Sequence, residues 1–356
     1  MSAPSYFAVI MAGGRGTRFW PASRKDRPKQ FLPIAGDAPM ITQTARRIQG
    51  LVDLERTLVV TGADQVDLVR EAAPEIPVEN ILAEPCGRNT AACCAFAAEI
   101  IHRRDPNSIQ FVLPADHVIE PESRFRETLD AAAQEAHAEG TLVTGGIRPT
   151  FPATGYGYIE ACDELAQRNG HPVQDVRRFV EKPDEARARE FLDAGNFLWN
   201  AGIFIWRTDA IRAAFAEYAN EIYAPIRDAA DIAAIHSAYD ALPSLPIDVA
   251  IMEKANNVRV LPLDYSWNDV GSWNALEDVL DADAAGNVKT GSARLIAEDA
   301  ENCIVYGDAN ERIALLGVDD LVVVRAGDTT LVCPKSRAQD VKRIVERLER
   351  EDPEAL

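Results

Sequence analysis

Residues 8–33 read AVIMAGGRGTRFWPASRKDRPKQFLP. The first five of them are apolar, which is typical of a buried strand in a parallel sheet. Gly13, Gly14 and Gly16 follow the apolar run directly. Because glycine has no Cβ, the backbone amides of such a turn can approach an anion closely. The stretch therefore predicts a strand followed by a phosphate-binding loop, and this unit fixes the start of an α/β fold.

The loop matches neither of the two common phosphate-binding patterns. A dinucleotide-binding fingerprint needs a glycine at position 19, where Phe19 stands, and a Walker A loop needs Gly-Lys-Ser/Thr at the end of the turn. A basic segment with Pro21 and Pro28 follows instead, and proline limits the freedom of a loop because it fixes φ. The pattern indicates a stiffened loop that presents cations to a polyphosphate.

Composition narrows the class of protein. The chain has 356 residues, of which 47% are hydrophobic and 26% charged, enough for one large domain with an appendage or for two domains. Its net charge of −19 argues against a nucleic-acid partner, so the basic loop indicates a small anionic ligand.

Targeting and redox signals are weak. The six cysteines show no Cys-x-x-Cys spacing, so we expect reduced thiols. The apolar run at 7–12 lacks a charged segment before it and belongs to the first strand, so no signal peptide is expected. No run is long enough to span a membrane. We expect a cytoplasmic enzyme that does not contact membranes.

Strand and helix patterns alternate through the first half of the chain. Apolar runs predict strands at 57–61, 81–82, 109–113 and 141–146. Helical periodicity marks 39–51, 64–73, 90–103 and 122–139. Such alternation predicts a parallel α/β sheet.

Polar residues follow two of these strands. Ligands of open α/β sheets bind beyond the carboxyl ends of strands, which makes Glu84, Arg88 and Asn89 candidates for nucleotide contact. The alternative is that Asn89 or Thr90 simply caps the next helix. Asp116, after the strand at 109–113, is a candidate Mg²⁺ ligand, with an Asx-type helix cap as its alternative.

Three later segments carry groups suited to a sugar phosphate. Gly155 and Tyr156 lie where glycine alternates with aromatic residues, as in a loop close to a sugar or a hairpin edge. Lys182 suits a phosphate monoester and Glu181 suits sugar hydroxyls, unless the two form only a surface ion pair. Asn200 is a candidate hydroxyl contact or an αL turn residue.

Two further aspartates stand near predicted helix starts. Asp248 is either a cap or a substrate contact, and base rates favour the cap. Asp269 lies in a turn between Trp267 and Trp273. With Asp116 it would give one Mg²⁺ two carboxylates and leave other positions for phosphate oxygens and water.

From about Gly286 the pattern changes to short β segments. We therefore divide the chain into residues 1–285 and a C-terminal β unit of 286–356. Composition alone allows any small β-sheet here. Ser336 and Gln339 form a predicted capping box for a terminal amphipathic helix, whose apolar face would dock on the β unit or on a second subunit.

The quoted stretch resembles the signature of the nucleotide-sugar pyrophosphorylases, in which Gly-Gly-x-Gly-Thr-Arg precedes a Pro-Lys pair. Its longer form, RFWPASR with PKQFL, is similar to the mannose-1-phosphate guanylyltransferase branch, as are the segments at 84–91, 154–158, 181–183 and 267–273. The resemblance implies a Rossmann-like mixed sheet in a GT-A-like α/β nucleotidyltransferase domain. It also implies a partial left-handed β-helix before the terminal helix, and no isomerase module or isomerase activity.

The resemblance also implies roles for individual residues. Arg18 and Lys29 would be catalytic, stabilising the triphosphate and the leaving pyrophosphate, and Asp116 and Asp269 would hold Mg²⁺. The nucleotide contacts would be Ala12, Gly13, Gly14, Arg15, Gly16, Thr17, Glu84, Arg88 and Asn89. The sugar-phosphate contacts would be Gly155, Tyr156, Glu181, Lys182 and Asn200.

The implied reaction joins GTP and mannose 1-phosphate to give GDP-mannose and pyrophosphate, in an enzyme expected to be a homodimer. The alternatives are a pyrophosphorylase for another sugar or nucleotide, and a catalytically silent nucleotide-sugar sensor. The presence of Arg18, Lys29, Asp116, Lys182 and Asp269 argues against the sensor, which would not need metal ligands or leaving-group cations.

Overall fold

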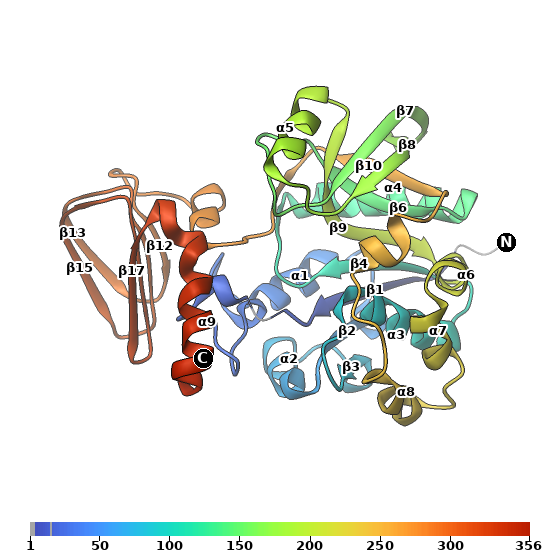
Figure 1. The fold of residues 1–356 in the computed structure, drawn as a ribbon, viewed down its shortest axis with the longest axis horizontal. Helices are drawn as coiled ribbons and strands as arrows, with labels where there is room; N and C mark the ends of the chain where they lie inside the picture. The colour runs from blue at the N-terminus through green and yellow to red at the C-terminus, as the bar shows by residue number, and fades with distance from the viewer. Residues whose placement is uncertain (1–3, 15) are drawn as a thin grey trace.

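A mixed sheet of nine strands forms the centre of the larger part of the molecule (Figure 1). The structure is a computed structural model and describes residues 4–14 and 16–356. The strand order is β3-β2-β1-β4-β9-β6-β10-β8-β7. The strands are β1 (Tyr6–Ala12), β2 (Thr57–Gly62), β3 (Ile81–Glu84), β4 (Ile109–Pro114), β6 (Leu142–Ile147), β7 (Tyr158–Arg168), β8 (His171–Val180), β9 (Phe197–Arg207) and β10 (Val258–Leu263).

Strand direction differs between the two halves of this sheet. Strands β3, β2, β1 and β4 pair in parallel, as the alternation of strands and helices predicts. Strand β9 runs antiparallel to β4 and β6, and β7 and β8 form an antiparallel hairpin. The alternation therefore predicts only part of the sheet, because an antiparallel hairpin needs no helical crossover and leaves no such pattern. The mixed sheet implied by the resemblance is confirmed.

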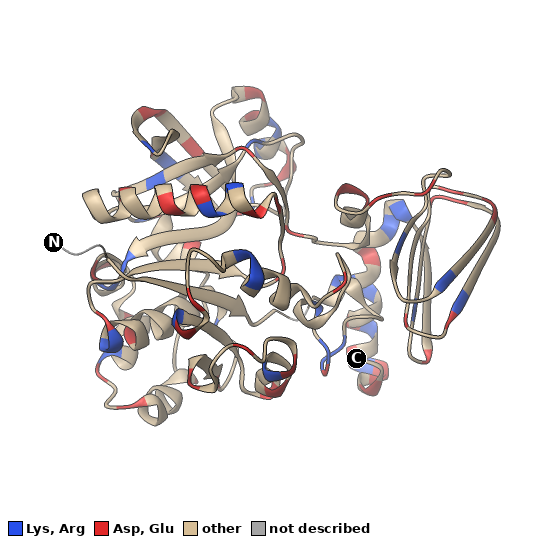
Figure 2. Cartoon of the chain, turned by 180° about the vertical axis from the view of Figure 1, so that it is seen from behind, with Lys and Arg blue, Asp and Glu red and all other residues tan. Residues whose placement is uncertain are grey.

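Helices cover both faces of the sheet. Alternate β1 residues point to opposite sides, so Val9 joins the core under α3, α6 and α7 while Ala8 joins the core under α4. Acidic and basic positions are mixed along α4 (Figure 2). Among the described residues, no helix combines the length and apolar composition of a membrane span. The helices are α1 (Met40–Ile48), α2 (Val66–Ala72), α3 (Asn89–Arg104), α4 (Glu122–Glu139), α5 (Glu185–Ala194), α6 (Thr208–Tyr218), α7 (Asn220–Arg227) and α8 (Ile232–Tyr239).

The smaller part stacks short parallel strands in successive coils, as a β-helix does (Figure 1). The last strand breaks the pattern by turning back antiparallel on its neighbour. One sheet holds β12 (Val288–Gly291), β14 (Ile304–Gly307), β16 (Leu321–Ala326) and β17 (Thr329–Pro334), and another holds β13 (Arg294–Glu301) and β15 (Arg312–Asp319). A separate antiparallel pair joins β5 (Val118–Glu120) to β11 (Ser266–Asn268). The β-helix-like unit expected from the resemblance is confirmed.

The terminal helix α9 (Val341–Glu351) begins later than the capping box predicts. A 3-10 turn spans Lys335–Asp340, and Gln339 Nε2 donates a hydrogen bond to Ser272 Oγ at 3.0 Å. The capping-box prediction is wrong because Gln339 joins this turn to the segment before the β unit. Val341 and Val345 of α9 lie in one core with residues of the β unit and of the basic loop.

The basic loop after β1 is held from the C-terminal side. Trp20 Nε1 donates to the carbonyl of Ala355 at 3.1 Å. Arg24 donates to Asp328 Oδ1 and to Thr329 Oγ1, both at 3.0 Å, in the turn between β16 and β17. The β unit and α9 therefore brace the loop that carries the predicted phosphate-binding turn. All six cysteines carry free thiols.

Candidate functional site

A cavity of about 430 Å³ lies beyond the carboxyl ends of β1, β3 and β4, beside β9. Residues from both halves of the sheet line it, so segments far apart in the sequence meet here. The predicted site residues in its wall are Gly13, Gly14, Glu84, Asn89, Asp116, Gly155, Tyr156, Glu181, Lys182, Asn200 and Asp269. The predicted residues outside the wall are Ala12, Gly16, Thr17, Arg18, Lys29 and Arg88, while Arg15 lies outside the described residues.

The glycine turn contributes Gly13 and Gly14 to the wall. A Cβ on Gly13 would lie in contact with Glu84 Oε2, at 3.6 Å, whereas a Cβ on Gly14 would have no heavy atom within 4 Å, so Gly14 faces open space. Gly16 has a different task. Its φ is 61°, and a Cβ there would lie 2.3 Å from the Cβ of Lys29, so glycine is needed for Lys29 to pass beneath the turn.

Ala12 and Thr17 do not face the cavity. The Ala12 carbonyl is buried and accepts hydrogen bonds from Gln30 Nε2 and Thr61 Oγ1, both at 3.0 Å. Thr17 starts a 3-10 turn and lines a small hollow against α9 instead. In this conformation both residues support the turn.

Lys29 is buried behind the wall, with 4% of its surface exposed. Its ammonium donates to the Asp116 carboxylate at 2.7 Å, to the Asp116 carbonyl at 3.2 Å and to the Asp269 carbonyl at 2.8 Å. It also lies 5.6 Å from the centre of the Phe19 ring. Lys29 therefore connects the two aspartates predicted to bind metal.

The surroundings of Asp116 favour its charged form. Burial favours its neutral form, but the Lys29 ammonium and then His117 outweigh burial and hold the pKa of the carboxyl below its usual value. Its side chain keeps 36% of its surface exposed and lines the cavity, so the carboxylate remains available to a ligand.

Asp269 reaches the same cavity from the turn after β11. Its Oδ1 accepts a hydrogen bond from the Tyr156 hydroxyl at 2.8 Å. Burial, followed by the Asp269 charge, raises the pKa of Tyr156, and the nearby positive charge of exposed Arg18 opposes this rise. Tyr156 therefore stays a neutral donor that orients Asp269.

The two aspartates fit a hard divalent cation that is shared with substrate. Mg²⁺ commonly uses one or two protein carboxylates and takes its other oxygens from substrate phosphates and water. In the described part of the chain, no group of three or more Asp, Glu, His or Cys residues could hold a metal alone. A site completed by substrate matches that arrangement.

On the nucleotide side, Glu84 ends β3 and is buried to 6% exposure. Its Oε1 accepts a hydrogen bond from the Tyr239 hydroxyl of α8 at 2.7 Å, while its Oε2 faces Gly13. Burial raises the pKa of Glu84 to about 7, although the Tyr239 hydrogen bond lowers it. The carboxyl therefore titrates near neutral pH and points one oxygen toward the glycine turn.

Arg88 and the start of α3 differ from the sequence-based expectations. Arg88 Nε donates to the Tyr239 carbonyl at 3.0 Å, and its Nη2 contacts Asp240. The guanidinium therefore binds the end of α8 and does not line the cavity. Thr90 does not cap α3, because its Oγ1 accepts from the amide of Ile247 at 2.8 Å. Asn89 does line the cavity, with a φ of 62°.

On the opposite side, Glu181 and Lys182 contact each other and both line the cavity. Lys182 has a φ of 46°, a left-handed backbone that a residue with a Cβ rarely adopts. A Cβ on Gly157 would lie 2.7 Å from Glu181 Oε2, so the absence of a side chain at Gly157 leaves room for the Glu181 carboxylate. Gly157 is a site residue that sequence reasoning missed beside Gly155 and Tyr156.

Asp248 was expected to be a helix cap by base rate, but it also lines this cavity. Its Oδ1 accepts a hydrogen bond from Asn200 Nδ2 at 2.7 Å. Asn200 has a negative-φ backbone within β9, so the αL-turn alternative for it is wrong. Nothing in the local pattern around Asp248 distinguishes it from an ordinary helix start.

His117 also lies in the wall, next to Asp116. Its Nδ1 accepts a hydrogen bond from Trp267 Nε1 at 3.2 Å, and the two rings meet edge to face. Burial lowers the pKa of His117 despite the charges of Asp116 and Asp269. The neutral imidazole fixes the Trp267 ring at the edge of the cavity.

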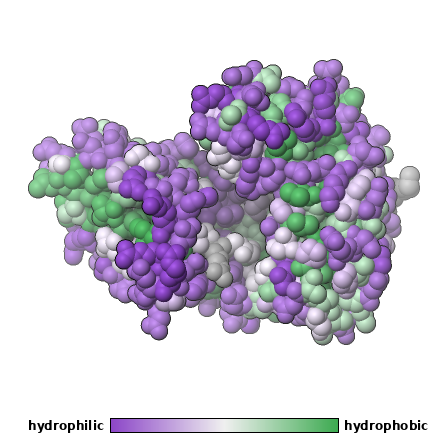
Figure 3. All heavy atoms as spheres, in the orientation of Figure 1, coloured by the Kyte–Doolittle hydropathy of each residue, from purple (hydrophilic) through white to green (hydrophobic). Residues whose placement is uncertain are grey.

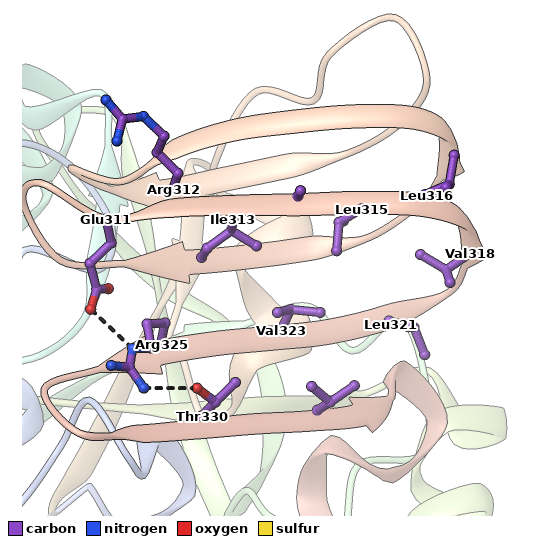
Figure 4. A pocket seen from close by; sticks show the side chains of 12 residues that line it. Glu311, Arg312, Ile313, Leu315, Leu316, Val318, Leu321, Val323, Arg325 and Thr330 are labelled. Carbon is purple, nitrogen blue, oxygen red and sulfur yellow. Dashed lines mark hydrogen bonds and ion pairs between the residues drawn. The ribbon is translucent and has the colours of Figure 1, made fainter.

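A second hollow of about 650 Å³ lies on the β unit (Figure 4). Apolar side chains such as Ile313, Leu315 and Val323 line most of it. Arg325, which also lines it, donates hydrogen bonds to Glu311 Oε1 at 3.1 Å and to Thr330 Oγ1 at 3.2 Å. This hollow lacks the glycine turn and the aspartates, so the first cavity is the better candidate for phosphate chemistry.

Two family models and several known proteins match this chain. The model described as nucleotidyl transferase matches residues 7–286, and the MannoseP isomerase/GMP-like beta-helix domain matches residues 283–348. The chain is 39% identical over 351 residues to the alginate biosynthesis protein AlgA of Pseudomonas aeruginosa. The aligned region covers 96% of this chain and 72% of that protein. It is 39% identical over 350 residues to the mannose-1-phosphate guanylyltransferase of Klebsiella pneumoniae, covering 96% and 73%.

A solved structure matches the chain over nearly its full length. The crystal structure described as mannose-1-phosphate geranyltransferase from Thermus thermophilus is 36% identical, with a TM-score of 0.88 over 97% of this chain and 99% of that one. The fold expected from the sequence is therefore confirmed in both its parts. Because the family model spans most of the sequence and a relative that is 39% identical covers 96% of it, the chain belongs to the nucleotidyl transferase family.

Proposed function

We propose that the protein transfers GMP from GTP to α-D-mannose 1-phosphate, forming GDP-mannose and pyrophosphate. The observation that supports this most strongly is the single cavity in which the glycine turn, two aspartates and the Glu181–Lys182 pair meet. The names of the relatives agree with the proposed acceptor. A pyrophosphorylase for another sugar or nucleotide would need the same phosphate-binding residues, so these residues do not distinguish it from the proposed enzyme. A catalytically silent sensor would not need both aspartates.

The proposed chemistry is an in-line displacement at the α-phosphorus. An oxygen of the sugar phosphate forms the new bond to that phosphorus, and the bond to the β-phosphate oxygen breaks with its electrons leaving on pyrophosphate. The sugar phosphate is already anionic at neutral pH, so no general base is required. Catalysis depends on alignment and on neutralising charge.

The residues of the cavity supply these two effects. Gly13 and Gly14 let the backbone approach the nucleotide, and Lys182 holds the sugar phosphate. Arg18 adds positive charge near Tyr156, while Lys29 keeps Asp116 and Asp269 in register. A divalent cation, which we propose is Mg²⁺ held by Asp116 and Asp269, would neutralise charge on the phosphate oxygens.

The direct test is to incubate the protein with GTP, mannose 1-phosphate and Mg²⁺ and to separate the products by anion-exchange chromatography. Equal amounts of GDP-mannose and pyrophosphate are expected. Pyrophosphate without GDP-mannose would indicate hydrolysis and would contradict the proposal.

We propose that Glu84 reads the base. Guanine presents two neighbouring N–H donors on one edge, and a carboxylate can accept both. Glu84 Oε2 faces the glycine turn, while Tyr239 fixes the other oxygen. The Glu84→Gln variant is expected to raise KM for GTP about tenfold, with a smaller change in KM for mannose 1-phosphate.

The same variant has a defined effect on stability. The folded protein holds the Glu84 proton more tightly than the unfolded chain, since its pKa rises from 4.5 to about 7. The wild type therefore loses stability as pH rises from about 4.5 to 7, and Glu84→Gln should avoid roughly 1–3 kcal/mol of that loss. Thermal unfolding should show a higher Tm for the variant at pH 8 but not at pH 4.5, and equal shifts at both would contradict the assignment.

We also propose that the protein is a homodimer joined through the β unit. Figure 3 shows hydrophobic side chains gathered on the outer end of this unit. Leu316 is 75% exposed there, and among the described strands β15 pairs only with β13. Such an open apolar edge favours pairing with another chain.

Light scattering after size exclusion tests the dimer. The wild type should have the mass of two chains, and Leu316→Arg should have the mass of one. Leu165→Arg is the matched control, because Leu165 is also exposed, at 56%, but lies on β7. A monomeric wild type would exclude the dimer. The cytoplasmic location and the division at residue 285 stay predictions.

A further inference from the structure

The backbone that carries Asp248 is fixed at the cavity by the start of α3. Thr90 Oγ1 accepts from the amide of Ile247 at 2.8 Å, and the amide of Ala91 donates to the Leu245 carbonyl at 3.0 Å. Asp248 then begins a π-helix, Asp248–Met252. Single π turns are rare and occur frequently at functional sites. The backbone immediately before Asp248 is therefore fixed to α3, and the π-helix begins at Asp248 itself.

The Asp248 carboxylate is oriented by Asn200. Asn200 Nδ2 donates to Asp248 Oδ1 at 2.7 Å. The Asn200 Oδ1 accepts from the amide of Gly202 at 3.1 Å and from Thr144 Oγ1 at 3.2 Å. Because protein groups already engage both ends of this amide, Asn200 is better placed to position Asp248 than to contact a sugar itself.

The surroundings of Asp248 match a sugar phosphate. Glu181 and Lys182 line the same wall, and their charges act on Asp248 in opposite directions. Burial, followed by the Glu181 charge, raises the pKa of Asp248 to about 6, so the group is mainly ionised at neutral pH. A partly buried carboxylate is costly unless it receives hydrogen bonds. Sugar hydroxyls can donate them, while the adjacent Lys182 ammonium suits the phosphate.

We propose that Asp248 is a specificity-determining residue that accepts hydrogen bonds from ring hydroxyls of the sugar 1-phosphate, and that Asn200 is its positioning residue. The proposal rests on the proposed function, because that function supplies the sugar 1-phosphate. It changes the role expected for Asn200, and for Asp248 it favours the substrate contact over the helix cap that base rates favour. Asp248 and Glu181 then bind the sugar from two sides of one subsite.

The first test uses Asp248→Asn and Asp248→Ala. The asparagine variant can still accept from Asn200 but loses the charge and one acceptor. Both variants should raise KM for mannose 1-phosphate by about tenfold or more, while KM for GTP changes less than about twofold. Asn200→Ala should likewise raise KM for mannose 1-phosphate more than KM for GTP.

The matched control is Asp231→Asn. Asp231 caps α8 by accepting from the amide of Ala234 at 2.8 Å, and it lies outside the cavity. If Asp248 is merely a helix cap, Asp248→Asn should behave like Asp231→Asn, with an unchanged KM for the sugar phosphate, because asparagine caps a helix about as well as aspartate. That result would overturn the proposal.

A second test identifies the hydroxyl. The kcat/KM of wild type and of Asp248→Ala is measured with mannose 1-phosphate and with its 2-, 3- and 4-deoxy analogues. The wild type should lose about tenfold or more with at least one analogue, and that loss should shrink to about twofold or less in Asp248→Ala, since the hydroxyl has lost its partner. If every deoxy analogue costs the same factor in both proteins, Asp248 does not contact the sugar.

These outcomes separate this inference from the proposed function. If the wild type makes no GDP-mannose but uses another sugar 1-phosphate, the proposed acceptor is wrong. The same comparison with deoxy analogues of the sugar actually used then tests Asp248. If no sugar 1-phosphate is used or bound, as measured by calorimetry with mannose and glucose 1-phosphates, both proposals are wrong.

Discussion

Lys29→Met is expected to lower kcat by about 1000-fold, because it removes the ammonium that joins Asp116 to Asp269. Methionine keeps the apolar stem that packs beneath the turn at Gly16. The loss should therefore report the charge and its hydrogen bonds. Steady-state turnover with saturating GTP and mannose 1-phosphate measures it.

Stability should change in the same variant, though far less than activity. The Asp116 carboxylate would lose its partner at 2.7 Å, but it is 36% exposed and can be hydrated. We expect a loss of about 1–2 kcal/mol. The pKa of Asp116 should rise, because burial would no longer be opposed by Lys29. A pH profile of turnover should show its acidic limb moving to higher pH.

Lys25→Met provides the control for Lys29→Met. Lys25 is an exposed lysine of the same basic loop. Its replacement removes the same net charge without touching either aspartate, so turnover should stay within about threefold of the wild type. If Lys25→Met lost as much activity as Lys29→Met, general attraction of the triphosphate would explain the effect better than the contacts of Lys29.

Asp269→Asn is expected to have the second large effect, a fall in kcat of about 100- to 1000-fold with Mg²⁺ present. The neutral amide keeps the size of the side chain and can still accept from the Tyr156 hydroxyl, which lies 2.8 Å from Oδ1. It loses the negative charge that a hard cation requires. The Mg²⁺ concentration for half-maximal turnover should rise as well.

Tyr156→Phe separates ligation from orientation. This variant retains the ring contacts with Trp199 and Trp267 but removes the hydroxyl. We expect a loss of about tenfold or less with the metal dependence nearly unchanged, because the carboxylate is still present. Unchanged turnover and Mg²⁺ dependence in Asp269→Asn would lead us to withdraw Asp269 as a metal ligand.

The sequence predicts the phosphate side of this site well. Gly13 and Gly14 follow a strand directly, and Asp116 follows another, so local patterns place them at the same edge of the sheet. Strand–helix alternation also predicts the parallel half of the sheet. It cannot predict the antiparallel return of β9, because that pairing depends on which distant strand β9 meets.

Side-chain direction accounts for most of the remaining differences. Both sequence neighbours of Arg88 line the cavity. The Arg88 guanidinium instead donates to the carbonyl of Tyr239, 151 residues further along the chain. Asp248 resembles a helix cap locally, and only its contact with Asn200 from β9 reveals the cavity. Lys29 belongs to a loop expected to present its cations to a polyphosphate, yet it is buried, and its ammonium donates to the Asp116 carboxylate and the Asp269 carbonyl. These features depend on tertiary packing and leave no periodic signal.

The most direct test of the proposed reaction is the kcat/KM for pyrophosphate release with GTP, ATP, UTP and dTTP, each combined with mannose 1-phosphate and with glucose 1-phosphate. We predict a maximum for GTP with mannose 1-phosphate, at least about tenfold above every other pair. A maximum for a different pair would contradict the proposed specificity, and the absence of release with every pair would contradict the assignment of this cavity as a catalytic site.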